Sequence, residues 1–353
     1  MSVVSPSASA SPATISLDGR RMCATCVLPE IKPHIELDAD GICNICQEYN
    51  RQERTPLLLE SDFIRMLDKH RGKQKYDCLV MCSGGNDSTA ALYFMKARYK
   101  VNPLAFTFDH GFEQADAVGN VRRACEKLDV DFMFFKTDFM KDMFKRLISS
   151  KSKAVICHPC SIWYMKLGYD MAARVGAPII IAGWTKGQSV KQEVMSACGC
   201  NVHQPEYKAM AAETQKFLDE QVSDMPQYKG FPRSMDEMLK QVKRSGNKAI
   251  VLSPHWFLPY GPDEYVKIIQ DNIGWQYPKE SYPRKSTNCS LNFVSVHNSM
   301  RDFGYTHYHV EMSKLVREGV MSRDEAIRNL EMDFSDKLLN GILGELQLSR
   351  KDL

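Results

Sequence analysis

The sequence predicts an α/β protein in which a doubly wound, mostly parallel sheet follows an N-terminal zinc-ribbon-like segment and precedes a C-terminal helical region. Two observations carry this prediction. Short apolar runs alternate with amphipathic helical patterns between residues 77 and 182, a pattern typical of strands covered by helices on both faces. Two Cys-x-x-Cys pairs precede that alternation, at a spacing that suits zinc. The expected organisation is a disordered leader at 1–20, a zinc-ribbon-like four-cysteine segment at 21–60, the α/β domain at 61–260 with a helical insertion near 207–245, and a partly helical substrate or partner region at 261–353.

The apolar runs and helical patterns give an ordered set of expected elements. Strands are expected at Asp77–Met81, Leu104–Phe108, Phe132–Lys136, Pro178–Ala182 and Ile250–Pro254, and helices at Thr89–Tyr99, Ala115–Leu128, Met140–Ser150 and Ser161–Val175. Ligands of such sheets bind beyond the carboxyl ends of the strands. The segments that follow the strands at residues 82–88, 109–111 and 183–185 should therefore line one crevice. The charged helical stretch from 207 to 243 has no glycine-rich motif and is expected to cover that crevice.

The segment Cys82 to Ser88, called the glycine loop below, reads Cys-Ser-Gly-Gly-Asn-Asp-Ser between the first expected strand and helix. A chain that leaves a strand at two glycines and enters a helix presents unpaired N–H groups and the positive end of a helix dipole, which together favour anions. The spacing is neither that of a Walker loop nor that of a dinucleotide fingerprint. We expect a nucleotide pyrophosphate site, with Asp87 orienting the loop or a magnesium ion. The competing interpretation is an ordinary Gly-Gly turn.

The four cysteines near the N-terminus form two pairs separated by 16 residues: Cys23, Cys26, Cys43 and Cys46. Each pair can make the tight thiolate turn that tetrahedral zinc requires. A segment of this length cannot build a hydrophobic core of its own, so bound metal is the expected source of its stability. Zinc is favoured over iron or an unmetallated segment.

A second set of cysteines lies further along the chain. Cys157 and Cys160 stand in Cys-His-Pro-Cys just before an expected helix, where the dipole should lower the pKa of both thiols. Such a pair can bind metal, carry a persulfide or hold part of an iron-sulfur cluster, and three cysteines would leave one iron open to a ligand. Cys289 is the preferred third ligand, with Cys198 and Cys200 as rivals; the alternative is that Cys157 and Cys160 only pack the turn.

The remaining cysteines and histidines are expected to have no metal-binding role. Cys78 and Cys125 lie in apolar strand and helix patterns and should be core residues, and Cys82 needs no chemical role. His110, His158, His255 and His297 are expected to be structural or to contact substrate, because none stands at a recognised ligand spacing with a carboxylate partner.

Composition excludes several classes of protein. The net charge of +3 over 353 residues is too small to indicate a nucleic-acid partner by itself. The first twelve residues are rich in Ser, Ala and Pro and lack the pattern of a signal peptide. No apolar run approaches the ~18 residues of a membrane span. A cytoplasmic location without a membrane partner is therefore expected, and in that compartment twelve cysteines favour metal ligands and thiols over disulfides.

With these pieces in order, the glycine loop resembles the Ser-Gly-Gly-x-Asp-Ser signature of the PP-loop ATP pyrophosphatases, and the fold it implies is the PP-loop (HUP-like) sheet. From about Cys23 onward the chain resembles the bacterial N-acetyl sugar amidotransferases of surface-polysaccharide biosynthesis within that superfamily. The shared features are the Cys-x-x-Cys pairs followed by Leu28-Pro29-Glu30, the glycine loop, the Cys-x-Pro-Cys turn, Arg301-Asp302-Phe303-Gly304-Tyr305, and Gly319-Val320-Met321-Ser322-Arg323-Asp324-Glu325-Ala326.

The resemblance implies an enzyme that splits ATP between the α and β phosphates, adenylates an amide or carbonyl oxygen of a sugar-like substrate, and lets ammonia from a separate glutaminase displace AMP. It implies Mg²⁺, pyrophosphate bound by Ser83, Gly84, Gly85, Asn86, Asp87 and Ser88, and adenosine near Asp109 and Gly183. Asp87, Ser88, Cys157, Cys160 and Cys289 are the expected catalytic residues. One departure is Asn86, where many relatives carry Lys.

Two other interpretations stay open. The layout also resembles tRNA thiolation enzymes, which implies a sulfurtransferase that holds a [4Fe-4S] cluster or a persulfide on Cys157, Cys160 and Cys289 and acts on tRNA or a small molecule. A third interpretation is a non-catalytic nucleotide-binding or zinc-ribbon interaction module. The sequence does not determine the oligomeric state, and a homodimer is compatible with it.

Overall fold

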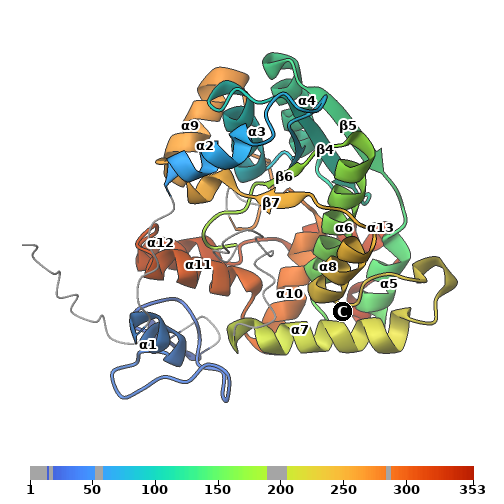
Figure 1. Ribbon diagram of the computed structural model, residues 1–353. Helices are drawn as coiled ribbons and strands as arrows, with labels where there is room; N and C mark the ends of the chain where they lie inside the picture. Colours follow the sequence, from blue (N-terminus) through green and yellow to red (C-terminus); the bar gives the residue numbers. More distant parts are fainter. Residues whose placement is uncertain (1–13, 16–18, 52–58, 189–204, 284–287) are drawn as a thin grey trace, which may run out of the picture.

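The computed structural model describes residues 14–15, 19–51, 59–188, 205–283 and 288–353 of the chain. Its centre is a five-stranded sheet in which every neighbouring pair is parallel (Figure 1). The spatial order is β5 (Asp131–Lys136), β4 (Pro103–Asp109), β3 (Cys78–Met81), β6 (Ile179–Ala182) and β7 (Ile250–Leu252). This arrangement confirms the expected doubly wound parallel sheet.

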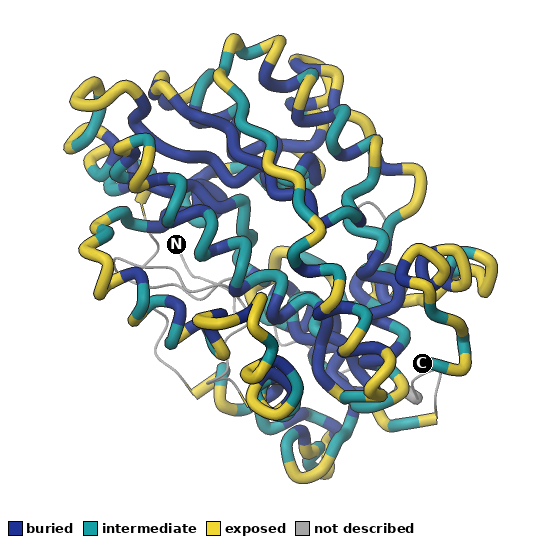
Figure 2. Tube along the Cα trace, turned by 90° about the vertical axis from the view of Figure 1, so that its right-hand side faces the viewer, coloured by how far each residue is buried: buried dark blue, intermediate teal, exposed yellow. Residues whose placement is uncertain are grey.

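Helices cover both faces of the sheet. Successive side chains of a strand point to opposite faces, so one strand contributes to the buried cluster on each side. Cys78 and Val80 of β3 pack into one buried apolar cluster, and Leu79 and Met81 pack into the other. The first cluster lies under α2 (Glu60–Asp68), α3 (Asn86–Ala97), α4 (Ala115–Leu128) and α9 (Pro262–Ile273). The second lies under α5 (Lys141–Ser149), α6 (Cys157–Val175), α8 (Met235–Arg244), α10 (Leu291–Phe303) and α13 (Asp336–Glu345). Strands β3, β4 and β6 are buried along their whole length, whereas the edge strand β5 is not; Figure 2 shows buried backbone gathered in the interior of the molecule.

The expected helical insertion forms the crossover between β6 and β7. It contains α7 (Pro205–Phe217), a π-helical turn (Leu218–Val222), a 3-10 turn (Pro226–Tyr228) and α8. Residues 189–204 at its start, which include Cys198 and Cys200, lie outside the described residues. None of its described residues from 205 to 244 lines the cavity identified below, and α8 packs against α6. The expected cover over the site is therefore not made by this described part.

The N-terminal segment lies against the C-terminal helices. Residues 14–15 of the predicted leader form β1 (Thr14–Ile15), which pairs with β2 (Arg21–Met22); residues 1–13 and 16–18 lie outside the described part. The four-cysteine segment contains isolated bridges and α1 (Asn44–Arg51). It sits beside α11 (His307–Arg317) and α12 (Arg323–Leu330) in Figure 1.

Two helices begin earlier in the chain than the sequence predicted. Helix α3 begins at Asn86 with Gly85 as its N-cap, and α6 begins at Cys157, so Cys157 and Cys160 belong to its first turn. After β7 the chain forms α9, which begins at Pro262. Ser322 caps α12, because its hydroxyl accepts from the Glu325 N–H at 3.2 Å. Within the described part of the chain, no helix is both long and apolar enough to cross a membrane.

Candidate functional site

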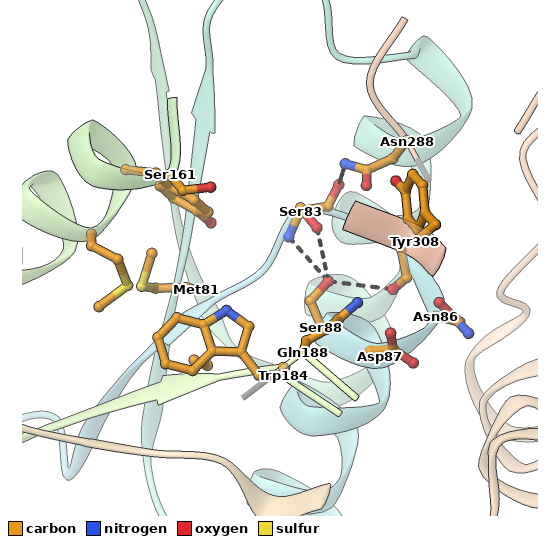
Figure 3. A pocket seen from close by; sticks show the side chains of 15 residues that line it. Met81, Ser83, Asn86, Asp87, Ser88, Ser161, Trp184, Gln188, Asn288 and Tyr308 are labelled. Carbon is orange, nitrogen blue, oxygen red and sulfur yellow. Dashed lines mark hydrogen bonds between the residues drawn. The ribbon is translucent and has the colours of Figure 1, made fainter. Parts of the chain in front are cut away.

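A cavity lies at the carboxyl ends of β3 and β6. These strands are neighbours although β4 and β5 separate them in sequence, so the loops that follow them leave in opposite directions and open a crevice, as doubly wound sheets do. The cavity has a volume of about 200 Å³. Its walls include Ser83, Gly85, Asn86, Asp87 and Ser88 after β3, and Gly183 and Trp184 after β6 (Figure 3).

The two serines of the glycine loop face each other at the start of α3. Ser83 N–H donates to Ser88 Oγ at 3.1 Å, and the two hydroxyl oxygens also lie 3.1 Å apart. The first N–H groups of a helix have no partner within the helix, and they add to the positive end of its dipole. Backbone donors and two hydroxyls therefore point to one place, as an anion such as pyrophosphate requires.

Glycine is required at two positions of this site by close backbone contact. Gly84 has a φ of +86°, and a side-chain carbon there would overlap the carbonyl oxygen of Ala117 in α4. Gly183 packs on the start of α3, where an added carbon would lie 2.5 Å from Ser88 Cα. Gly84 thus allows α4 to approach the loop, and Gly183 brings the end of β6 against Ser88.

The carbonyls of the loop are held from behind by side chains of distant segments. Gly84 O accepts from Trp275 Nε1 at 3.0 Å and from Asn120 Nδ2 at 3.2 Å. Ser83 O accepts from Asn288 Nδ2 at 2.9 Å. These bonds fix the loop conformation before any ligand binds, which lowers the ordering cost of binding.

Asp87 makes contacts inside the protein. Its carboxylate accepts from the Tyr265 hydroxyl, and its backbone carbonyl accepts from His255 Nε2 at 2.8 Å. Burial raises the pKa of Asp87 and lowers that of His255. These contacts hold the start of α3 against Tyr265 and His255, and the role of Asp87 in orienting the loop or a magnesium ion stays a prediction.

Several cavity residues were not predicted from the sequence. Ser161 follows Cys160 and Asn288 precedes Cys289, so adjacency to a predicted residue was a usable signal for these two, whereas Trp184 lies in the segment 183–185 that was expected to line the crevice. Tyr164, Gln188 and Tyr308 offered no comparable signal. Tyr308 is in α11, more than 200 residues from the glycine loop in sequence, and reaches the cavity only through tertiary packing.

Asp109, expected near adenosine, ends β4 but is not among the residues that line the cavity. It is buried, lies 3.4 Å from Lys136 Nζ, and accepts from the Gly111 N–H at 2.7 Å. Burial and the nearby charge of Asp109 raise the pKa of Glu113 to about 8. The contacts of Asp109 are those of a residue that shapes the turn after β4.

The second set of cysteines lies close to this region. The Cys157 thiol donates to Ser295 Oγ at 3.5 Å, and Cys289 Sγ lies 3.6 Å from His110 Nε2. Burial raises the pKa of Cys157, Cys160 and Cys289, and the charges of neighbouring cysteines contribute at Cys160 and Cys289. The expected lowering of the pKa of Cys157 and Cys160 by the helix dipole is therefore wrong, because desolvation outweighs it. Cys78, Cys82 and Cys125 are buried, as expected of core residues.

The four N-terminal cysteines form a compact group whose sulfur atoms all lie within 4.8 Å of one another. Cys23 Sγ is 4.0 Å from Cys46 Sγ, and Cys26 Sγ is 3.8 Å from Cys43 Sγ. A tetrahedral zinc ion with Zn–S bonds of ~2.3 Å places its sulfurs ~3.8 Å apart. The N–H groups of Thr25, Cys43 and Cys46 also point at thiol sulfurs, at 3.2 to 3.4 Å. The cysteines therefore fit zinc.

Arg323 joins this four-cysteine segment to the helical region. Its guanidinium donates to Cys23 O at 2.9 Å and to Cys26 O at 3.0 Å. Ser313 Oγ accepts from the Val27 N–H at 3.1 Å. Tyr305 and Val310 share a buried cluster with the cysteines. The stretch from 319 to 326, noted in the sequence, thus contributes through Arg323 to holding the turn at Cys23 and Cys26.

Comparisons with known proteins give one informative match and several weak ones. Residues 77–159 match the family model described as "Queuosine biosynthesis protein QueC". "Uncharacterized protein MJ1599" of Methanocaldococcus jannaschii is 23% identical over 257 residues, which is 73% of each chain.

Among solved structures, an NH3-dependent NAD synthetase from Campylobacter jejuni is 15% identical with a TM-score of 0.30, covering 67% of this chain and 98% of that one. An NMN synthetase from Francisella tularensis is 9% identical with a TM-score of 0.37, covering 82% of this chain and 98% of that one. Scores this low carry no argument. The QueC match runs from β3 through the glycine loop to the first turn of α6, so this part of the α/β domain is similar to that family.

Proposed function

We propose that this protein adenylates an amide or carbonyl oxygen of a small, sugar-like substrate with ATP, and that ammonia then displaces AMP. The observation that carries the proposal is the glycine loop at the start of α3, which opens on the cavity between β3 and β6. In this proposal the loop binds the pyrophosphate part of ATP. Mg²⁺, when bound, would neutralise the phosphate charge and ease departure of pyrophosphate.

The described residues divide the work in this proposal. Ser83 and Ser88 donate to phosphate oxygens, and Gly84 and Gly183 allow the close backbone approach. Asp87 holds the start of α3 against Tyr265 and His255. Trp184 offers an apolar wall for a ring, beside Met81 (Figure 3). A glutaminase that docks near the cleft would supply ammonia. The expectation of a homodimer stays a prediction.

The first test is formation of AMP and pyrophosphate from ATP and Mg²⁺ in the presence of N-acetylated sugars and ammonium. Ser88→Ala removes one hydroxyl, a loss of about 1 kcal/mol that weakens ATP binding roughly fivefold. Asn86→Lys places a positive charge at the loop and should tighten ATP binding. Asp87→Ala should abolish pyrophosphate release. Pyrophosphate release that persists in Asp87→Ala, or no release with any acceptor, would contradict an adenylating enzyme and favour a binding module.

A second function, sulfur transfer to tRNA or a small molecule, is favoured by one specific observation. Cys160 and Cys289 are direct neighbours in sequence of the cavity residues Ser161 and Asn288, so a sulfur carrier on Cys157, Cys160 and Cys289 would stand next to the cavity. Analysis of iron and labile sulfide in protein purified without oxygen separates the two functions. Iron and sulfide that disappear in Cys157→Ala/Cys160→Ala support a [4Fe-4S] cluster and sulfur transfer. Zinc alone, unchanged by that double substitution, supports the amidotransferase.

A further inference from the structure

Three side chains outside the four-cysteine segment converge on one point beside the glycine loop. Cys289 Sγ lies 3.6 Å from His110 Nε2, and Glu113 Oε1 lies 3.4 Å from the same nitrogen. The three atoms all lie within 4.8 Å of one another. Tetrahedral zinc bonds of ~2.0–2.1 Å to nitrogen and oxygen and ~2.3 Å to sulfur place an N–S pair ~3.6 Å and an N–O pair ~3.4 Å apart. Both observed distances match this geometry.

The arrangement differs from that of a nucleophile activated by histidine. In such a triad the thiol contacts one ring nitrogen, and the carboxylate contacts the other. Here the thiol of Cys289 and the carboxyl of Glu113 both face Nε2 of His110. Two acidic groups that converge on a single lone pair are arranged as ligands around an ion. We propose that His110, Glu113 and Cys289 bind one divalent transition-metal ion of the zinc class, in addition to the ion held by the four-cysteine segment.

Backbone pairing holds these residues in place across the chain. Glu113 and Cys289 form an isolated antiparallel bridge. The Gln114 N–H donates to Asn288 O, and the Ser290 N–H donates to Phe112 O, both at 2.9 Å. The turn after β4 and the segment before α10 are therefore joined around the proposed site, although about 175 residues of chain separate them.

The surroundings orient the proposed ligands. Asn288 Nδ2 donates to Glu113 Oε2 at 2.6 Å, which leaves Oε1 facing His110. The His110 ring is buried among the aromatic rings of Phe108, Phe112 and Phe144. A hydrogen bond to the second oxygen of a liganding carboxylate is the usual means by which metal sites fix their ligands.

Asn288 also connects the proposed site to the glycine loop. The same Nδ2 donates to Ser83 O at 2.9 Å, and Asn288 lines the cavity. Three protein ligands leave one position of a tetrahedral ion for water or substrate, as in catalytic rather than structural zinc sites. The inference does not depend on which nucleophile the enzyme uses. It competes with the iron-sulfur interpretation only for Cys289.

The test is metal content and Co²⁺ spectroscopy on the full-length chain, with circular dichroism to confirm folding. Wild type equilibrated with Zn²⁺ should hold two ions, and His110→Ala and Cys289→Ser should each hold one. Co²⁺ substitution should give thiolate-to-cobalt absorption from two sites, of which Cys289→Ser removes one. Glu113→Gln, which keeps the shape of the side chain, should bind the second ion at least tenfold more weakly. Cys157→Ser is the matched control and should hold two ions.

A second ion that is absent from wild type, or present and unchanged in His110→Ala, overturns the proposal. Iron and sulfide that require Cys157 and Cys289 but not His110 also overturn it, in favour of a cluster. Either result leaves the proposal of adenylation untouched, because that one is judged by pyrophosphate release in Asp87→Ala.

Discussion

Substitution of Gly84 by Ala tests whether the glycine loop depends on close contact with α4. At a φ of +86° an L-residue is strained by about 1–2 kcal/mol. The added carbon would also overlap the Ala117 carbonyl oxygen and lie 2.5 Å from its carbonyl carbon, and overpacking against backbone of this kind costs about 1–3 kcal/mol. We expect Gly84→Ala to lower the free energy of unfolding by about 2–5 kcal/mol.

Gly72→Ala is the matched control for this measurement. Gly72 also has a positive φ, +69°, but an added carbon there meets nothing within 4 Å. Gly72→Ala should lower the free energy of unfolding only by the cost of backbone strain, about 1–2 kcal/mol. Both variants are compared with wild type by denaturant unfolding with Zn²⁺ present, and by ATP binding. An equal decrease in the free energy of unfolding for Gly72→Ala and Gly84→Ala, with unchanged ATP binding in Gly84→Ala, would refute the argument that α4 fixes the loop.

Three further predictions concern the metal segment and the support of the loop. Cys26→Ser should release roughly one zinc ion per chain and lower the thermal midpoint, because the remaining thiols stay buried without their metal; an unchanged zinc content would show that the four-cysteine group is not the site. Arg323→Ala leaves two carbonyls without this donor and should cost about 1–3 kcal/mol in thermal unfolding, whereas the exposed Arg328→Ala should be neutral. Burial lowers the pKa of His255, so below pH ~6.5 the unfolded chain binds a proton that the folded chain does not, and protonation favours unfolding. The thermal midpoint of the wild type should therefore fall between pH 7 and pH 5. In His255→Gln the midpoint should fall less over the same pH range.

The strands and the glycine loop could be predicted because their signals are local. Buried parallel strands read as apolar runs, and the break at Gly84 and Gly85 marks the turn into α3. Helix α4 was predicted at its observed bounds, Ala115–Leu128, because its apolar positions recur with helical spacing and the apolar strands on either side limit it.

The parts that could not be predicted depend on contacts between distant segments. The proximity of His110, Glu113 and Cys289 follows from strand order and from the bridge between their two segments. The expectation that His110 lacks a carboxylate partner was wrong, because Glu113 is three residues away and turns back toward it. The raised pKa of Cys160 likewise comes from burial, which a pattern of cysteines near a helix start does not reveal.

The link between the four-cysteine segment and Arg323 has a consequence for how the chain folds during synthesis. The turn at Cys23 and Cys26 leaves the ribosome well before Arg323, because the guanidinium that holds its carbonyls is 300 residues further along the chain. Through that interval the helices that cover the turn have not yet been made, so a zinc ion bound by the four cysteines would be the main source of its stability. Zinc supply during translation should therefore affect the yield of folded protein more strongly than zinc added after release.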